Sequence, residues 1–228
     1  MGPSPTTLVI TTRSGIGASV AKRLQDRGDA ILQTDPSLDL TDAAAVAAAL
    51  QSLCGSNTVD RVVLAAIDPS AFRAAPITSL SEAEWDQAAE YSMRAAFIAL
   101  QQAHSVVADG GRVILLLPTV VTTGVAGLVP LCTAVEAIRV MAKAVARRWG
   151  ARSITVNTIE VELSAFMLGD DDAEDVVMPA VPVLGQPALP PSSAVDDVLG
   201  LVDMLATPAA GAITGALLVA DRGTVMQP

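Results

Sequence analysis

The chain is poor in the side chains that carry most enzyme chemistry. Its 228 residues include one histidine (His104), one tyrosine (Tyr91) and two lysines (Lys22 and Lys143). A single histidine excludes the usual multi-histidine metal site. Aromatic residues make up only 3% of the chain, so it has few stacking platforms. Any catalytic proposal must work with this short set of groups.

Cysteine is almost as scarce. Cys54 and Cys132 lie far apart in the sequence and have no paired spacing. That spacing argues against both a zinc site and a disulfide framework. Free thiols suit a reducing compartment, so we expect a cytoplasmic protein.

Positive charge is also limited. Fourteen Lys and Arg residues face 24 Asp and Glu residues, which gives a net charge of −10. Such a charge repels nucleic acid and anionic membranes, so we expect neither as a partner. Residues 113–135 form an uncharged stretch long enough to span a bilayer. Its prolines and glycines favour a buried strand, a loop and a helix start instead, and the N-terminus has no signal-peptide pattern.

What the chain does have is apolar residues in alternating strand and helix patterns. Hydrophobic residues make up 51% of the chain and charged residues 17%, and the length fits one α/β domain. Short apolar runs predict strands at 7–10, 30–32, 62–66, 113–117, 154–156 and 216–220. Helices are predicted after the first strand and at 42–53, 81–108, 131–149 and 195–205. This order predicts an α/β fold with one doubly wound parallel sheet and helices on both faces.

One segment, residues 169–193, interrupts this alternation. An acidic run, Asp170–Asp175, is followed by several prolines. We favour a flexible, solvated surface loop; the alternative is a lid over a ligand cleft.

The first strand-to-helix turn carries the main functional signal. It contains Gly15, Ile16 and Gly17, where the backbone can approach a pyrophosphate at a helix N-terminus. Asp35 lies 18 residues beyond Gly17, at the end of the second strand. A carboxylate there can accept hydrogen bonds from an adenosine ribose. The alternative is that both glycines only allow close packing of helix on sheet.

Several collinear motifs then match a known family. Ser14–Gly17 matches the end of a Thr-Gly-x-x-x-Gly-Ile-Gly turn, and Asp39 with Leu40 matches an adenine-contacting Asp followed by an apolar residue. Further matches cover 142–157 and 213–223. In these features the chain resembles the classical short-chain dehydrogenases/reductases, close in layout to 3-oxoacyl-carrier-protein reductases. The resemblance implies a Rossmann-like fold, a nicotinamide dinucleotide site and oxidoreductase activity.

The catalytic residues of that family are missing. The family uses a Tyr as general acid/base, a Lys that lowers its pKa, a Ser that polarises the carbonyl and an Asn that supports a water relay. The matching positions hold, in that order, Leu131, Val135, Pro118 (Thr119 with a one-residue shift) and Ser92. A one-residue shift of the first pair gives Cys132 and Glu136, which does not restore it. We therefore predict no catalytic residue.

The cofactor motifs are also altered. Thr11 replaces the first glycine, residues 64–67 replace an Asn-Asn-Ala-Gly stretch, and Val161 with Glu162 replaces a Pro-Gly pair. The adenosine end persists in Gly15, Gly17, Asp35 and Asp39. We expect no cofactor or weak NAD(H) binding. NADP(H) is less favoured because Asp35 would repel its 2′-phosphate, although Arg13 is a basic residue in the turn.

Three functions follow from these observations. We favour a redox-inactive subunit that forms a homo- or hetero-oligomer through helices 81–108 and 131–149, with an active chain of the same family as its partner. The alternative is an atypical NAD(P)-dependent oxidoreductase acting on a carbonyl or hydroxyl substrate. A ligand-sensing or scaffold module that uses the 169–193 loop is the third interpretation.

Overall fold

The computed structural model describes residues 5–12, 15–119, 124–166, 187–190 and 193–226. Its described part contains one sheet of parallel strands in the order β2-β1-β3-β4-β5-β6. The strands are β1 Thr6–Thr11, β2 Ala30–Gln33, β3 Val59–Ala65, β4 Val107–Pro118, β5 Thr155–Val161 and β6 Leu217–Ala220. The main helices are α1 Gly15–Asp26, α2 Ala43–Cys54, α3 Glu82–Trp85, α4 Tyr91–Val106, α5 Val129–Trp149 and α6 Ala194–Ala206.

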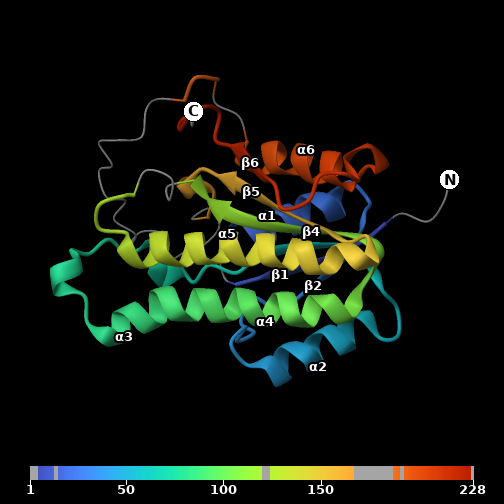
Figure 1. The fold of residues 1–228 in the computed structure, drawn as a ribbon, viewed down its shortest axis with the longest axis horizontal. Coiled ribbons are helices and arrows are strands. Elements are labelled where there is room, and N and C mark those ends of the chain that lie inside the picture. Colours follow the sequence, from blue (N-terminus) through green and yellow to red (C-terminus); the bar gives the residue numbers. More distant parts are fainter. Residues whose placement is uncertain (1–4, 13–14, 120–123, 167–186, 191–192, 227–228) are drawn as a thin grey trace.

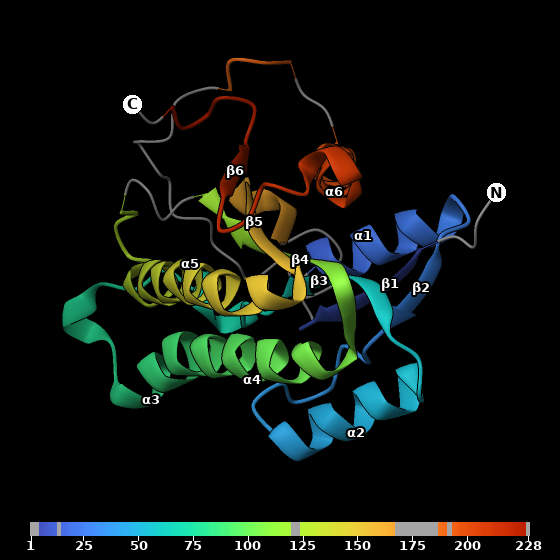
Figure 2. The same ribbon diagram turned by 45° about the vertical axis from the view of Figure 1, so that its right-hand side comes forward.

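Helices cover both faces of this sheet. Helices α2, α4 and α5 lie on one face, and α1 and α6 lie together on the other (Figures 1 and 2). The central strands are buried on both sides, which explains why they read as continuous apolar runs rather than alternating ones. The predicted Rossmann-like, doubly wound parallel sheet is therefore confirmed.

The start of the α3–α4 region follows its sequence signal. The Ser81 hydroxyl accepts a hydrogen bond from the Glu84 amide at 3.3 Å, and the Glu84 carboxylate accepts one from the Ser81 amide at 2.9 Å. These two bonds form a capping box, for which Ser-x-x-Glu is the sequence signature. A π-helical turn at Asp86–Glu90 separates α3 from α4, so the predicted helix is not uniform.

The end of the same region differs from the prediction. The helix ends at Val106 and β4 begins at Val107, six residues before the predicted strand start. Val107 pairs with Val59 of β3, and the register then shifts before Arg61 pairs with Arg112. Pairing with β3 therefore extends β4 through a Gly-Gly stretch that reads locally as a turn.

The uncharged stretch 113–135 is divided between β4 and the start of α5. Across the ranges that the structure describes, no helix is both long and apolar enough to cross a membrane. The predicted loop at 169–193 falls largely on 169–186 and 191–192, which lie outside the described residues. The prediction of a single domain over 1–228 stays an expectation.

Candidate functional site

The candidate site lies at the carboxyl ends of the strands. In the sheet, β1 lies between β2 and β3. The chain runs from β1 to β2 on one side and then crosses to β3 on the other side, so the edge beyond β1 is a topological switch point. Ligands of open α/β sheets bind in the crevice beyond such a point. The carboxyl end of β1 and the N-terminus of α1 meet at this edge of the sheet, and residues 13 and 14 between them lie outside the described part.

Gly17 is required for packing of α1 on the sheet. A Cβ atom at Gly17 would lie 2.4 Å from Thr11 Oγ1 and 3.1 Å from the Ala65 Cβ. Helix α1 can approach β1 and β3 this closely only because residue 17 has no side chain. The packing interpretation of Gly17 is therefore correct. Gly15 and Ile16, at the N-terminus of the same helix, are also buried.

Thr11 occupies the position of the family's first glycine and is hydrogen-bonded through both its hydroxyl and its amide. Its hydroxyl donates to the Thr12 carbonyl at 2.7 Å, and its amide donates to Thr34 Oγ1 at 3.3 Å. The Thr12 hydroxyl in turn donates to the Ile67 carbonyl at 2.7 Å. The bonds to Thr34 and Ile67 connect the end of β1 to the segments that follow β2 and β3.

Asp35 and Asp39 lie on the exposed turn that follows β2. Asp35 Oδ1 accepts hydrogen bonds from the Ser37 amide at 2.8 Å and the Ser37 hydroxyl at 2.7 Å. These bonds lower the pKa of Asp35 and keep it ionised. Within the described residues its Oδ2 has no hydrogen-bond donor, so Asp35 retains an acceptor for a ribose hydroxyl.

Asp39 and Leu40 differ in accessibility. Asp39 is exposed, and hydrogen bonds from the Thr41 hydroxyl and amide lower the pKa of its carboxyl. The Leu40 side chain is fully buried in the core, so only its backbone can take part in a ligand site. The structure thus brings Gly15, Ile16 and Gly17 together at the α1 N-terminus. It places Asp35 and Asp39 on the neighbouring turn.

The positions of the family's catalytic pair belong to the hydrophobic core. Leu131 and Val135 lie one turn apart on α5, and both side chains are 0% exposed. Ser92 is buried too, where its hydroxyl donates to the Ala88 carbonyl at 2.8 Å and accepts from the Asp68 amide at 3.0 Å. Thr119, at the shifted Ser position, is also buried. None of these positions presents a titratable group.

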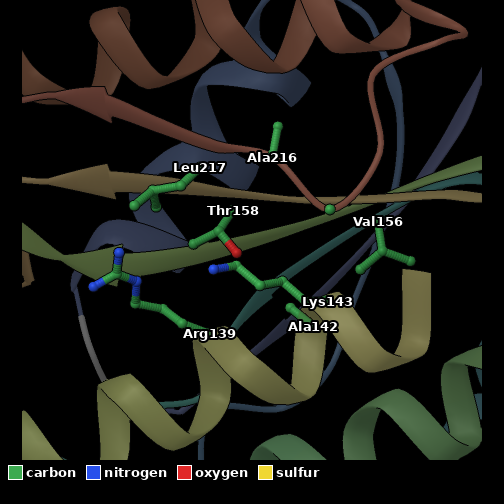
Figure 3. Close-up of a pocket in the computed structure, with 8 residues that line it drawn as sticks. Arg139, Ala142, Lys143, Val156, Thr158, Ala216 and Leu217 are labelled. Atoms are coloured by element: carbon green, nitrogen blue, oxygen red, sulfur yellow. The ribbon is translucent and has the colours of Figure 1, made fainter. Parts of the chain in front are cut away.

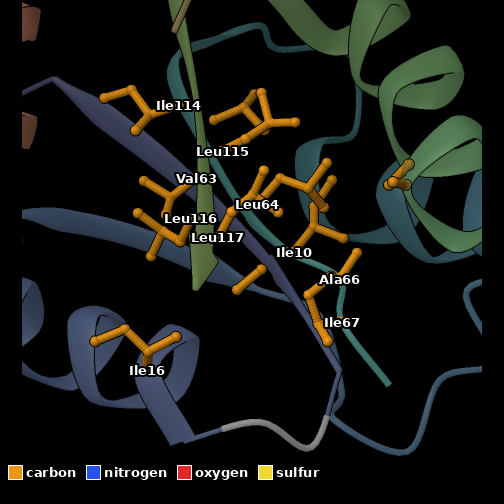
Figure 4. Close-up of a cluster of buried hydrophobic side chains, with 14 of the residues drawn as sticks. Ile10, Ile16, Val63, Leu64, Ala66, Ile67, Ile114, Leu115, Leu116 and Leu117 are labelled. Atoms are coloured by element: carbon orange, nitrogen blue, oxygen red, sulfur yellow. The ribbon is translucent and has the colours of Figure 1, made fainter. Parts of the chain in front are cut away.

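The segment that replaces Asn-Asn-Ala-Gly is likewise apolar. Leu64, Ala66 and Ile67 are buried, and they lie beside Ile10 in the core at the end of β1 and β3 (Figure 4). No side chain of this segment therefore offers a polar contact to a cofactor.

The most unusual ionisable group lies at the end of β5. Glu160 is 0% exposed, and its nearest cation is Arg139 of α5, with Nε 3.3 Å from Oε1. Burial raises the pKa of Glu160 to about 7, against the lowering effect of Arg139. The neighbouring Glu162 pairs with Arg222. Glu160 and Glu162 therefore each form an ion pair with an arginine of the same chain.

Sequence reasoning missed the Arg139–Glu160 pair. Arg139 follows the buried Val135 by four residues, so it lies next to the buried stripe of the amphipathic helix α5. A positively charged side chain next to a buried stripe indicates an acidic partner. Arg139 and Lys143 also line a cavity of about 10 Å³ with Thr158 of β5 (Figure 3). That space suits at most one water molecule.

The described residues show no nucleophile, base or metal site that could replace the family's catalytic groups. Burial, with a smaller contribution from Glu136, raises the pKa of the Cys132 thiol, which disfavours a nucleophilic thiolate. The His104 ring packs on Trp149 with centroids 4.9 Å apart. The described residues hold no cluster of metal-ligating side chains.

Known proteins that are similar to this chain share its fold. A family model described as enoyl-(acyl carrier protein) reductase matches residues 37–225. A D-threitol dehydrogenase from Mycolicibacterium smegmatis is 26% identical over 95% of this chain and 91% of its own length. A short-chain dehydrogenase/reductase from Serratia marcescens is 27% identical, with a TM-score of 0.74 over 97% of this chain and 98% of that chain.

A further solved structure corrects our expectation about the cofactor. A short chain dehydrogenase from Burkholderia cenocepacia in complex with NADP is 23% identical, with a TM-score of 0.75 over 97% of both chains. The expectation of no cofactor, or of weak NAD(H) with NADP(H) less favoured, is therefore wrong: proteins of this fold bind NADP(H), which points to a cofactor rather than none.

Proposed function

Because this chain belongs to the short-chain dehydrogenase/reductase family, we propose that it is a dinucleotide-binding member that does not turn over substrate alone. We further propose that it acts as a subunit beside an active chain of the same family. The observation that carries the proposal is the pair Leu131 and Val135, which are apolar and 0% exposed.

The adenosine end fits a nicotinamide dinucleotide. The α1 N-terminus, with Gly15, Ile16 and Gly17, would hold the pyrophosphate, because its free amides and helix dipole favour negative charge. Asp35 keeps one carboxylate oxygen free for a ribose hydroxyl, and Asp39 is exposed on the same turn. A bound nicotinamide would supply the hydride acceptor or donor.

The proton-transfer half of the reaction has no matching group. Leu131 and Val135 cannot hold or move a proton, and a phenol with its ordinary pKa near 10 would in any case need a nearby cation. Arg139 lies one turn beyond Val135 but pairs with Glu160 and Glu136. Glu160 is fully buried and therefore does not contact substrate. These contacts support a structural rather than a catalytic role for Arg139 and Glu160.

The outer face of α4 and α5 supports a role in assembly. These helices lie side by side (Figure 2). Phe97 on α4 is 52% exposed and Val140 on α5 is 62% exposed. Large apolar side chains left open on adjacent helices favour a protein partner. This is the face that the family resemblance assigns to oligomers.

Dinucleotide binding and turnover can be measured on the same purified sample. We expect NAD(H) or NADP(H) at 100 times its dissociation constant to stabilise the chain by about 2.7 kcal/mol. We expect no oxidation or reduction of carbonyl and hydroxyl substrates until an intact family member is added. No thermal shift with any dinucleotide would refute the binding half of the proposal, and turnover by the chain alone would refute the other half.

A further inference from the structure

The amino-terminal end of the sheet places two arginines side by side. Arg61 of β3 and Arg112 of β4 are register partners on adjacent strands. Both approach α6: Arg112 donates to the Leu205 carbonyl, and Arg61 faces Asp203. Like charges directly opposite each other on neighbouring strands repel, so each guanidinium needs compensation.

Arg112 has that compensation. Its Nε donates to the Leu205 carbonyl at 3.2 Å, and its Nη1 donates to the carbonyls of Gly110 and Gly111. Leu205 lies in the last turn of α6, where the helix dipole is negative and favours a cation.

Arg61 does not. The residue is 4% exposed, and its Nε is buried without a hydrogen-bond partner. Its nearest carboxylate, Asp203, is 3.8 Å away. Asp203 already accepts two hydrogen bonds of 2.7 Å from Arg27, one on each oxygen. Among the described residues, the Arg61 guanidinium therefore has no acceptor at hydrogen-bond distance, a costly state for a buried charge.

Arg61 is also among the residues that line a cavity of about 250 Å³. It is lined by Arg61, Arg112, Asp60 and the segment 108–111, with Pro5 and Ala206 at its border. Its two carboxylates have donors of their own. Asp60 accepts from the Thr6 amide at 2.8 Å, and Asp109 accepts from Arg152 at 2.6 Å. Neither takes up the charge of Arg61.

We propose that this cavity is a binding site for a small oxyanion, the carboxylate or phosphate group of a small solute, with Arg61 as its main ligand. The planar fork of a guanidinium matches either group with paired hydrogen bonds. Asp60 and Asp109 at the wall disfavour high negative charge, so the site favours a carboxylate or a monoanionic phosphate over a dianion. It lies at the amino ends of β3 and β4, opposite the dinucleotide crevice, and does not depend on the function proposed above.

The test follows thermal unfolding of the full chain in acetate and in inorganic phosphate, against chloride at the same ionic strength. We expect a saturable rise in Tm with half-saturation below about 10 mM, an ordinary weak affinity. The anion with the lower half-saturation identifies the preferred group. Arg61→Met should keep the fold, because it replaces an uncompensated buried charge with an apolar side chain of similar length.

Arg61→Met should lose the saturable rise for both anions. Arg73→Met is the matched control, because it removes the same charge from an exposed residue that only pairs with Glu84. It should respond like the wild type. The proposal is overturned if the wild type shows no saturation below about 10 mM. It is equally overturned if Arg61→Met keeps the response, since the anion is then held elsewhere, for instance at the α1 N-terminus.

A second measurement covers the case in which Arg61→Met does not fold. The NMR signal of the Arg61 Nε–H in the wild-type chain should shift along a saturation curve on addition of acetate or phosphate. An unchanged signal at anion concentrations that raise Tm would assign the anion to another site and overturn the proposal.

Discussion

Glu160 is a buried acid whose charged form is poorly stabilised by the fold. Its two carboxylate oxygens have no hydrogen-bond donor among the described residues, and Arg139 is its one close cation. Glu136 and Asp221 add negative charge nearby. Burial outweighs the attraction of Arg139 and raises the pKa of Glu160 from 4.5 to about 7.

This shift predicts a specific pH dependence of stability. A raised pKa in the folded state means that the folded protein binds the proton more tightly than the unfolded chain. The resulting stability is present below about pH 4.5 and is lost as the pH rises through about 7. Glu160→Gln should remove this dependence. Between pH 4.5 and 8 the wild type should lose about 3 kcal/mol relative to the variant.

Urea unfolding of both proteins across that pH range measures the difference. Glu90→Gln, at an exposed position of the π-helical turn, removes the same charge and is the control; it should follow the wild type. Parallel pH profiles for wild type and Glu160→Gln would show that the carboxyl group is charged at every pH tested, against the expectation.

At the scale of elements, the contact between α1 and the sheet positions the dinucleotide turn. Gly17 lies against Thr11 of β1 and Ala65 of β3, with no room for a side chain. Thr11 in place of a glycine makes this contact tighter, because its Oγ1 and Cβ are the two atoms that a Cβ at position 17 would meet first.

Gly17→Ala should therefore destabilise the fold by about 1–3 kcal/mol, the usual cost of overpacking a core contact. Thr11→Gly in the same chain should recover part of that loss, because it removes both nearest atoms. Gly200→Ala on α6 is the control, since no atom lies within 4 Å of its added Cβ. It should stabilise by up to about 1 kcal/mol through helix propensity. Chemical denaturation of the wild type and the three variants measures these effects, and equal behaviour of Gly17→Ala and Gly200→Ala would contradict the packing account.

The elements were predictable where the signal is local. Ser81 with Glu84 marks a helix start, and Asp42 caps α2 through the amides of Ala44 and Ala45. The start of β4 at Val107 was not predictable, because pairing with Val59 of β3 sets it. Arg139 and Glu160 meet across α5 and β5, and no spacing in the sequence joins them.

The site was predictable only in part for the same reason. Leu131 and Val135 are visible in the sequence as lost catalytic positions, and the structure adds that both are core residues. The wrong expectation about the cofactor came from departures at Thr11, residues 64–67 and Val161 with Glu162. Such departures show which family contacts are missing, but they do not show that the remaining contacts are too few to bind a dinucleotide.

At the scale of the whole molecule, the exposed apolar side chains Phe97 of α4 and Val140 of α5 predict association. Phe97→Asp and Val140→Asp should each shift the chain toward the monomer, because a buried unpaired carboxylate at an interface is unfavourable. Ile77→Asp is the control: Ile77 is also an exposed large apolar residue, but it lies before α3. The molar mass of the wild type and each variant, measured after size-exclusion chromatography, tests this prediction. A wild-type chain that runs as a monomer, alone and with an intact family member, would remove this face as an interface.

The proposed function combines dinucleotide binding with a missing proton-transfer group. Its most direct test is a single-turnover assay in which the purified chain, saturated with NADH or NADPH, meets carbonyl substrates, and the absorbance of the reduced nicotinamide is followed. We expect bound dinucleotide and no oxidation above the rate in free solution, since Leu131 and Val135 move no proton. Oxidation of the bound dinucleotide at an enzymatic rate by the chain alone would contradict the account.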